Sequence, residues 1–111
     1  MSNKDLKRII KNHYDKLCYI QPLIGSEKFV TNSYRKWACL ELLREIEKSE
    51  GYPFQLTPIE LLQNFSEKMK LYAGKKERNC LIFIEASNLA EYFIEESWKY
   101  ISKSSKRKED F

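Results

Sequence analysis

Glycine and proline are scarce in this chain, which has three of each among 111 residues. An all-β protein needs many tight turns, and turns depend on these two residues, so their scarcity argues against that class. Lysine, glutamate, leucine and isoleucine are abundant instead, and all four are tolerated or favoured in helices. A chain of this length has room for a single core. The composition therefore favours one all-α domain.

Residues and motifs that carry catalysis are nearly absent. The sequence has one histidine and no Gly-rich phosphate loop, GxSxG or HExxH motif. Its three cysteines, Cys18, Cys39 and Cys80, are odd in number and lack a CxxC pair, so they favour neither a zinc site nor a disulfide framework. Reduced thiols are typical of the cytosol, and no apolar run approaches the ~18 residues of a membrane span. We therefore expect a soluble, cytoplasmic protein that is not an enzyme and binds no metal or cofactor.

Two single residues need a separate assessment. His13 falls in the middle of the apolar face of the first predicted helix, where it could act as a general base or ligand, or be a half-buried structural side chain. The structural interpretation is favoured, because no second ligand or nucleophile can be placed beside it. Cys80 lies near a helix start, which can lower the pKa of a thiol. For all three cysteines, however, the role of a small hydrophobic side chain is favoured.

Hydrophobic periodicity predicts two helices in the first half of the chain. The first runs from about Lys4 to Ile20, and Pro22 stops it nearby. Residues 22–31 form a connection whose apolar side chains we expect to tuck onto the bundle, with a helical turn after Ser26 as an alternative. The second helix starts between residues 31 and 33 and ends at about residue 49.

The second half of the chain carries clearer signals. Thr57, Pro58 and Glu60 have the order of a capping box with proline at the first helical position, so the third helix begins at Pro58 and runs to about residue 72. A fourth helix spans residues 79–102, and its apolar arc covers roughly half of its circumference, so it must contact at least two neighbours. Residues 103–111 lose this periodicity and are predicted to be a flexible, basic tail. Together these elements predict a four-helix antiparallel bundle over residues 1–102, with the fourth helix at its centre.

Aromatic side chains on polar helix faces indicate a protein partner. Tyr34 and Trp37 lie opposite the core stripe of the second helix, and Tyr92 lies among charged neighbours on the fourth. Tyr34 and Trp37 are either covered by the segment at 22–31, which is favoured, or exposed. Because Tyr and Trp carry much of the energy of interfaces, the leading hypothesis is a non-enzymatic adaptor, inhibitor or accessory subunit, and a homo-oligomer is equally compatible. Replacing Trp37 and Tyr34 by Ala is then expected to weaken binding with little loss of stability.

Basic clusters support a second hypothesis, nucleic-acid binding through phosphate contacts. A net charge of +4 is mild for such a protein, and Glu60 and Glu67 on the third helix would repel phosphates. The connection before that helix is also longer than a helix-turn-helix allows, so this hypothesis ranks second. The basic residues are Lys4, Lys7, Arg8 and Lys11 in the first helix, Lys68, Lys70, Lys75, Lys76 and Arg78 around the third connection, and Lys103, Lys106, Arg107 and Lys108 in the tail.

In size, charge and helix count the chain is similar to small helical proteins of bacteria and phages, including the four-helix bacteriocin immunity proteins. No motif is shared with them, so the resemblance assigns no role to any residue. It adds bacteriocin immunity as a third hypothesis and suggests a phage or another mobile element as the source.

Overall fold

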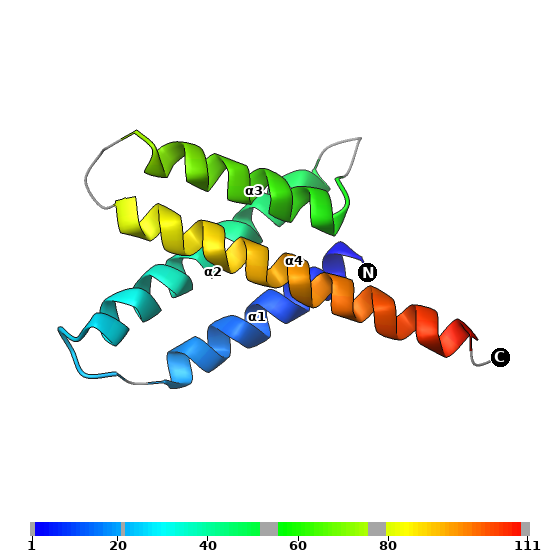
Figure 1. Cartoon of the computed structure of the whole chain (residues 1–111), viewed down its shortest axis with the longest axis horizontal. Helices are drawn as coiled ribbons and strands as arrows, with labels where there is room; N and C mark the ends of the chain where they lie inside the picture. The colour runs from blue at the N-terminus through cyan, green and yellow to red at the C-terminus, as the bar shows by residue number, and fades with distance from the viewer. Residues whose placement is uncertain (1, 21, 52–55, 76–79, 110–111) are drawn as a thin grey trace.

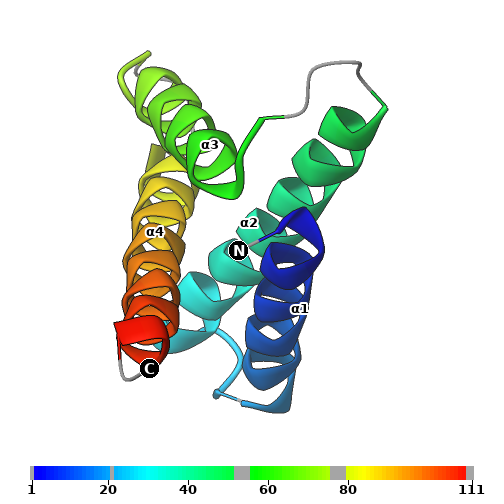
Figure 2. The ribbon, with the colours of Figure 1, turned by 90° about the vertical axis from the view of Figure 1, so that its right-hand side faces the viewer.

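The computed structural model describes residues 2–20, 22–51, 56–75 and 80–109, with side chains up to residue 99, and within them it contains four α-helices and no strand. The helices are α1 (Asn3–Tyr19), α2 (Glu27–Glu50), α3 (Pro58–Ala73) and α4 (Cys80–Glu109). α1 and α2 form one antiparallel hairpin and α3 and α4 form another, and α4 lies diagonally across α2 (Figure 1). Figure 2 shows the two hairpins side by side. The predicted all-α, four-helix architecture is confirmed.

Side-chain caps fix where two of the helices begin. At α1 the Ser2 hydroxyl accepts the Asp5 backbone N–H at 3.2 Å, and the Asp5 carboxylate accepts the Ser2 backbone N–H at 3.1 Å. At α3 the Thr57 hydroxyl accepts the Glu60 backbone N–H at 3.2 Å, with Pro58 first in the helix. Both contacts satisfy backbone donors that the first helical turn leaves unpaired. The predicted start of α3 is therefore confirmed.

Two predicted boundaries differ from the structure. α2 begins at Glu27 and not at residues 31–33, because the Ser26 hydroxyl accepts the Phe29 backbone N–H at 3.1 Å and caps the helix earlier. Its start was hard to predict because α2 contacts all three other helices, so its apolar residues do not form one stripe. α4 continues to Glu109, past the expected end at residue 102. That last part extends beyond the other helices (Figure 1), where no apolar face is needed, and flexibility of the tail stays a prediction.

The core is built from all four helices and is closest-packed between α3 and α4. There Ala86 and Ala90 are fully buried, and the hydroxyls of Ser66 and Ser87 lie 3.1 Å apart in a buried hydrogen bond. Such small side chains let two helices approach closely. Phe93 connects this hairpin to α1, since its ring lies 5.3 Å from that of His13. α4 thus contacts the other three helices, as its broad apolar arc predicted, and none of the described helices has the length and apolar character of a membrane span.

Candidate partner-binding surface

The loop between α1 and α2 displays large apolar side chains, and we call residues 19–20 and 22–24 the hairpin tip. Tyr19 is 90% exposed, Ile20 58%, Leu23 84% and Ile24 89%. Sequence reasoning missed this surface, because it expected the apolar residues of 22–31 to tuck onto the bundle. The early start of α2 leaves too short a connection to fold back, so Leu23 and Ile24 point into solvent.

The tip is held in a fixed turn. Gly25 has a φ of 85°, a left-handed conformation that glycine adopts without strain. The Leu23 carbonyl accepts hydrogen bonds from the Ser26 backbone N–H at 3.0 Å and from its hydroxyl at 2.6 Å. One turn further along α2, the buried Asn32 amide donates to the Leu17 carbonyl at 3.0 Å and ties the two helices together. The apolar side chains are thus displayed by an ordered scaffold.

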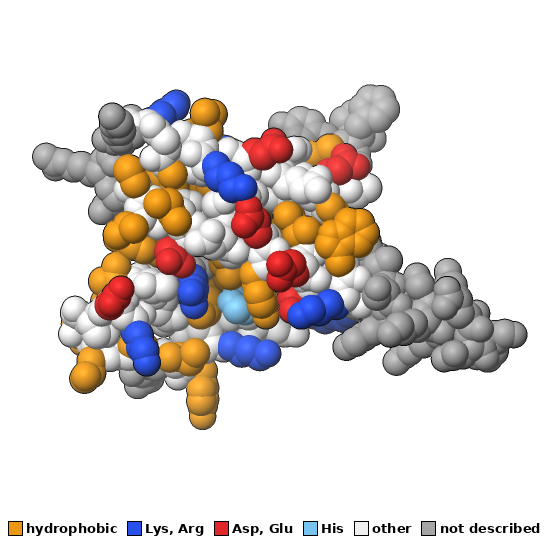
Figure 3. Space-filling view, in the orientation of Figure 1, with side chains coloured by type: hydrophobic (Ala, Val, Ile, Leu, Met, Phe, Trp, Pro, Cys, Tyr) orange, Lys and Arg blue, Asp and Glu red, His pale blue; other side chains and the backbone are white. Residues whose placement is uncertain are grey.

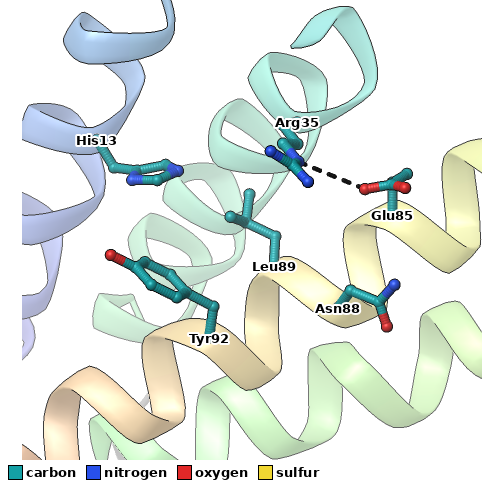
Figure 4. Close-up of a pocket in the computed structure, with 6 residues that line it drawn as sticks. All are labelled: His13, Arg35, Glu85, Asn88, Leu89 and Tyr92. Atoms are coloured by element: carbon teal, nitrogen blue, oxygen red, sulfur yellow. Dashed lines mark hydrogen bonds and ion pairs between the residues drawn. The ribbon is translucent and has the colours of Figure 1, made fainter. Parts of the chain in front are cut away.

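Three adjoining hollows lie between α1, α2 and α4, and together we call them the central groove. The hollow nearest the tip has a volume of about 530 Å³, the middle one about 310 Å³ and the last about 190 Å³. The first two share Arg35, and the last two share His13 and Tyr92. Figure 4 shows the middle hollow, where side chains from three helices surround an open space. Its lining comprises His13, Arg35, Glu85, Asn88, Leu89 and Tyr92.

His13 lies at the centre of the groove and is packed against aromatic rings. Its imidazole is 5.3 Å from the ring of Tyr92 and 5.3 Å from that of Phe93, which it meets edge-on. Burial, and then the positive charges of Lys16 and Arg35, lower the pKa of His13 below its ordinary value. The imidazole is therefore mainly neutral at pH 7. This geometry fits the favoured interpretation of His13 as a structural side chain.

The charges along the groove are unequally paired. The Glu85 carboxylate lies 3.4 Å from Nε of Arg35 (Figure 4), and that of Glu96 lies 3.2 Å from Nζ of Lys99. Glu27 occupies the first turn of α2, where the helix dipole stabilises a negative charge. Lys16 and Lys28 are exposed, and within the described part of the chain neither forms an ion pair. The carboxylates along the groove are therefore stabilised by nearby groups, whereas Lys16 and Lys28 have no carboxylate partner among the described residues.

The three aromatic residues selected from the sequence have different surroundings. Tyr92 is 44% exposed and lines the groove. Trp37 is half-buried against the core, with its ring 6.1 Å from that of Phe83. Tyr34 is also half-buried and lies outside the groove lining. Trp37 packs against Phe83 of α4, whereas the sequence suggested that the segment at 22–31 covers it, so we expect it to contribute more to stability than the sequence indicated.

Most of the predicted basic clusters are interrupted by carboxylates or aromatic rings. Four of these lysines and arginines form ion pairs with nearby carboxylates, and Lys75 lies over the Tyr72 ring at 5.6 Å. Lys4 and Lys11 are exposed and form no ion pair with described residues, while Lys76 and Arg78 lie outside the described residues. The cluster on α1 and the described part of the cluster around the α3–α4 connection are thus broken up on the surface, while the side chains of the tail cluster lie outside the described residues. The pairs are Lys7–Glu50 at 2.7 Å, Arg8–Asp5 at 3.4 Å, Lys68–Glu45 at 3.4 Å and Lys70–Glu91 at 2.6 Å.

The cysteines have the surroundings of ordinary side chains. Burial raises the pKa of Cys39 to about 12, so its thiol stays protonated and unreactive at neutral pH. Cys18 is exposed and Cys80 is half-buried. Over the described ranges, no three His, Cys, Asp or Glu side chains are grouped to hold a metal ion. No protein-family model, curated protein or solved structure matches the chain, so the tip and the groove carry the functional argument.

Proposed function

We propose that this protein is a non-enzymatic binding module that acts by contacting another protein, with the hairpin tip in the contact. The observation that carries this proposal is the exposure of Tyr19, Ile20, Leu23 and Ile24, which ranges from 58% to 90%. Contiguous exposed apolar patches mark interaction sites on proteins. Burying one such side chain is worth about 1.5–3 kcal/mol, so a partner that covers the tip gains substantial free energy.

The rigidity of the tip supports the same proposal. The turn from Leu23 to Ser26 and the bond from Asn32 to Leu17 hold the exposed side chains in one arrangement before any partner arrives. A surface that is ordered in advance loses less conformational entropy on binding. The groove beside the tip adds Tyr92, an aromatic side chain that is 44% exposed. The proposed contact surface therefore combines an apolar projection with an adjoining hollow.

Replacing Leu23 and Ile24 by Ser tests the proposal. Tagged wild-type and variant chains are expressed in the native cell, recovered, and compared by the mass and amount of bound protein. We expect wild-type to retain a partner in stoichiometric amount and the Leu23→Ser/Ile24→Ser variant to retain at least tenfold less. A Leu71→Ser/Leu81→Ser variant is the matched control, since these residues are 63% and 62% exposed on other helices. Equal recovery of the partner by the tip variant would contradict the proposal.

Bacteriocin immunity is one form that such protein binding could take. The assay is direct: expression of the chain either rescues a bacteriocin-sensitive cell or leaves it sensitive. If immunity is the function, rescue is lost in the Leu23→Ser/Ile24→Ser variant and kept in the Leu71→Ser/Leu81→Ser variant.

Nucleic-acid binding is a second proposal, supported by Lys4 and Lys11. Both are exposed on α1 and have no carboxylate partner within the described residues. Their contacts with phosphates would weaken steeply between low and moderate salt. A Lys4→Glu/Lys11→Glu variant should then bind DNA or RNA less tightly than wild-type at low salt. Absence of binding by wild-type chain at low salt would remove this alternative.

A further inference from the structure

We propose that the central groove receives a helix of about three turns from the protein partner, and that this helix is amphipathic with acidic residues beside its apolar face. This inference rests on the proposed function of protein binding and adds the chemistry of the partner. Three properties of the groove support it: its length, its lining and its unpaired charges.

The length of the groove matches a short helix. Its lining extends from Ile9 in α1 to Ile20, the residue that follows this helix, and from Glu85 to Glu96 along α4. At 1.5 Å per residue, each side measures about 16 Å, which is three helical turns. Helix-in-groove recognition uses apolar anchors spaced three or four residues apart on one face of the bound helix. The three adjoining hollows offer separate places for such anchors.

The lining supplies apolar contacts and orienting polar groups. Leu17, Leu89 and Phe93 are buried at the base, while Tyr92 remains 44% exposed on one side. Tyrosine at a groove wall gives a large contact area with a polar end. Arg35 donates to Glu85 through Nε alone at 3.4 Å, so its two terminal nitrogens remain to bind a carboxylate.

The charges select an acidic partner. The carboxylates beside the groove are each stabilised locally, by Arg35, by Lys99 or by the start of α2. Lys16 and Lys28 have no such partner in the described structure. Figure 3 shows the histidine, the single pale-blue side chain, with Lys or Arg side chains on both sides of it. Complementary charge of this kind steers association and sets partner choice.

The same charges disfavour the chain's own C-terminal stretch as the occupant. That stretch contains Lys103, Lys106, Arg107 and Lys108, which Lys16 and Lys28 would repel. A second copy of the chain has the same net charge of +4, which disfavours the association of two copies. An acidic helix from a different protein satisfies the lysines without breaking an existing ion pair.

A selection from random peptides tests this inference with a defined probe. A display library of 16-residue peptides is selected on the full-length chain, and the enriched peptides are measured against two charge-reversal variants. Lys16→Glu/Lys28→Glu changes the groove. Lys4→Glu/Lys11→Glu changes two exposed residues of α1 outside the groove lining by the same net charge and is the matched control. Circular dichroism establishes that both variants keep the wild-type helix content.

We expect enriched peptides to be net negative, with apolar residues at positions i, i+3 or i+4, and i+7. Their affinity should fall about tenfold in Lys16→Glu/Lys28→Glu and change less than twofold in Lys4→Glu/Lys11→Glu, and it should weaken as salt rises. Enrichment of neutral or basic peptides, no enrichment, or equal loss in the two variants would overturn the inference. A wild-type dimer that dissociates in Lys16→Glu/Lys28→Glu would also overturn it, since the occupant would be a second copy.

These results can be separated from failure of the proposed function. If no acidic peptide is enriched but capture of a whole partner still depends on Leu23 and Ile24, the proposed protein binding is supported and the groove inference is overturned. If neither peptides nor a whole partner bind, both proposals fall together.

Discussion

The α3–α4 contact and the tip of the α1–α2 hairpin use their apolar residues in opposite ways. Between α3 and α4, Ala86, Ala90 and the Ser66–Ser87 pair are buried, and the helices approach closely along their length. At the end of the α1–α2 hairpin, Leu23 and Ile24 are more than four-fifths exposed, and a polar bond from Asn32 joins the helices. The α3–α4 contact thus buries its small side chains, whereas the tip of the α1–α2 hairpin leaves its apolar side chains in solvent.

This difference assigns separate roles to the apolar residues: buried ones stabilise the fold, and exposed ones are available to a partner. An apolar residue buried in a core has no surface left for a partner to contact. An apolar residue held in solvent lacks the free energy of burial unless a partner covers it. The packed interior, to which all four helices contribute, therefore accounts for stability, and the exposed end of α1–α2 is where binding is proposed. Substitutions in the packed interior should lower the free energy of unfolding strongly. Substitutions at the exposed tip should change it little.

Phe65→Ala on α3 should give the largest effect. Phe65 is 3% exposed within the core, and truncation of a buried phenylalanine costs about 3–5 kcal/mol. Urea unfolding followed by circular dichroism measures the free energy of unfolding. A loss below about 1 kcal/mol would mean that the buried face of α3 adds little to stability, and the comparison would fail.

Trp37→Ala should come next, at about 2 kcal/mol. Trp37 is half-buried against Phe83, so it loses a share of the 3–5 kcal/mol typical of a fully buried aromatic ring. The sequence led us to expect little loss, because Trp37 lies opposite the core stripe of its helix. Tyr34→Ala, on the same face, is the companion measurement. Unchanged unfolding of Trp37→Ala by urea would restore Trp37 as a free contact residue.

Local signals in the sequence predicted the parts of the fold that local chemistry determines. Thr57 with Pro58 defined the start of α3, and the broad apolar arc of residues 79–102 predicted a helix with several neighbours. The start of α2 depended on tertiary contacts, since a helix surrounded by three others has no single apolar stripe. Only Ser26 as an N-cap signalled the true start, and its weight could not be judged from sequence.

The candidate site was less predictable than the fold. Tyr92 was found because it lies among charged residues on α4. The exposed tip was missed, because apolar residues in a connection are ordinarily covered, and only the position of α2 shows that Leu23 and Ile24 are not. The groove joins residues from three helices that are distant in sequence. Neither its lining residues nor the ion pairs among them could be predicted from the sequence, because both depend on how the three helices pack.

Asn32→Ala should destabilise the chain by about 1–2 kcal/mol. The Asn32 amide is buried and donates to the Leu17 carbonyl at 3.0 Å, and its loss leaves that carbonyl without its partner. Because this bond joins α1 to α2, amide hydrogen exchange in the Asn32→Ala variant should accelerate more at the start of α2 than in α3. Uniform acceleration over all helices would show that the two hairpins do not differ in how they are held.

His13 makes stability depend on pH where the hairpins meet. Its pKa in the folded chain is lowered below the ordinary value of 6.5 by burial and by Lys16 and Arg35. As pH falls below 6.5 the unfolded chain binds the proton first, so the stabilising contribution is complete above 6.5 and is lost toward the folded pKa. The free energy of unfolding should fall from pH 7 to pH 5 in wild-type and stay flatter in His13→Gln; equal slopes would contradict this.

The smallest expected effect is on the tip itself. Ile24→Ser should change the free energy of unfolding by less than about 0.5 kcal/mol, because a side chain that is 89% exposed gives up almost no burial. The same substitution at Leu23, 84% exposed, should behave alike. Urea unfolding of each single variant tests both. A loss above about 1.5 kcal/mol would mean that the segment tucks onto the bundle, as its sequence suggested, and that no apolar surface is left there for a partner to cover.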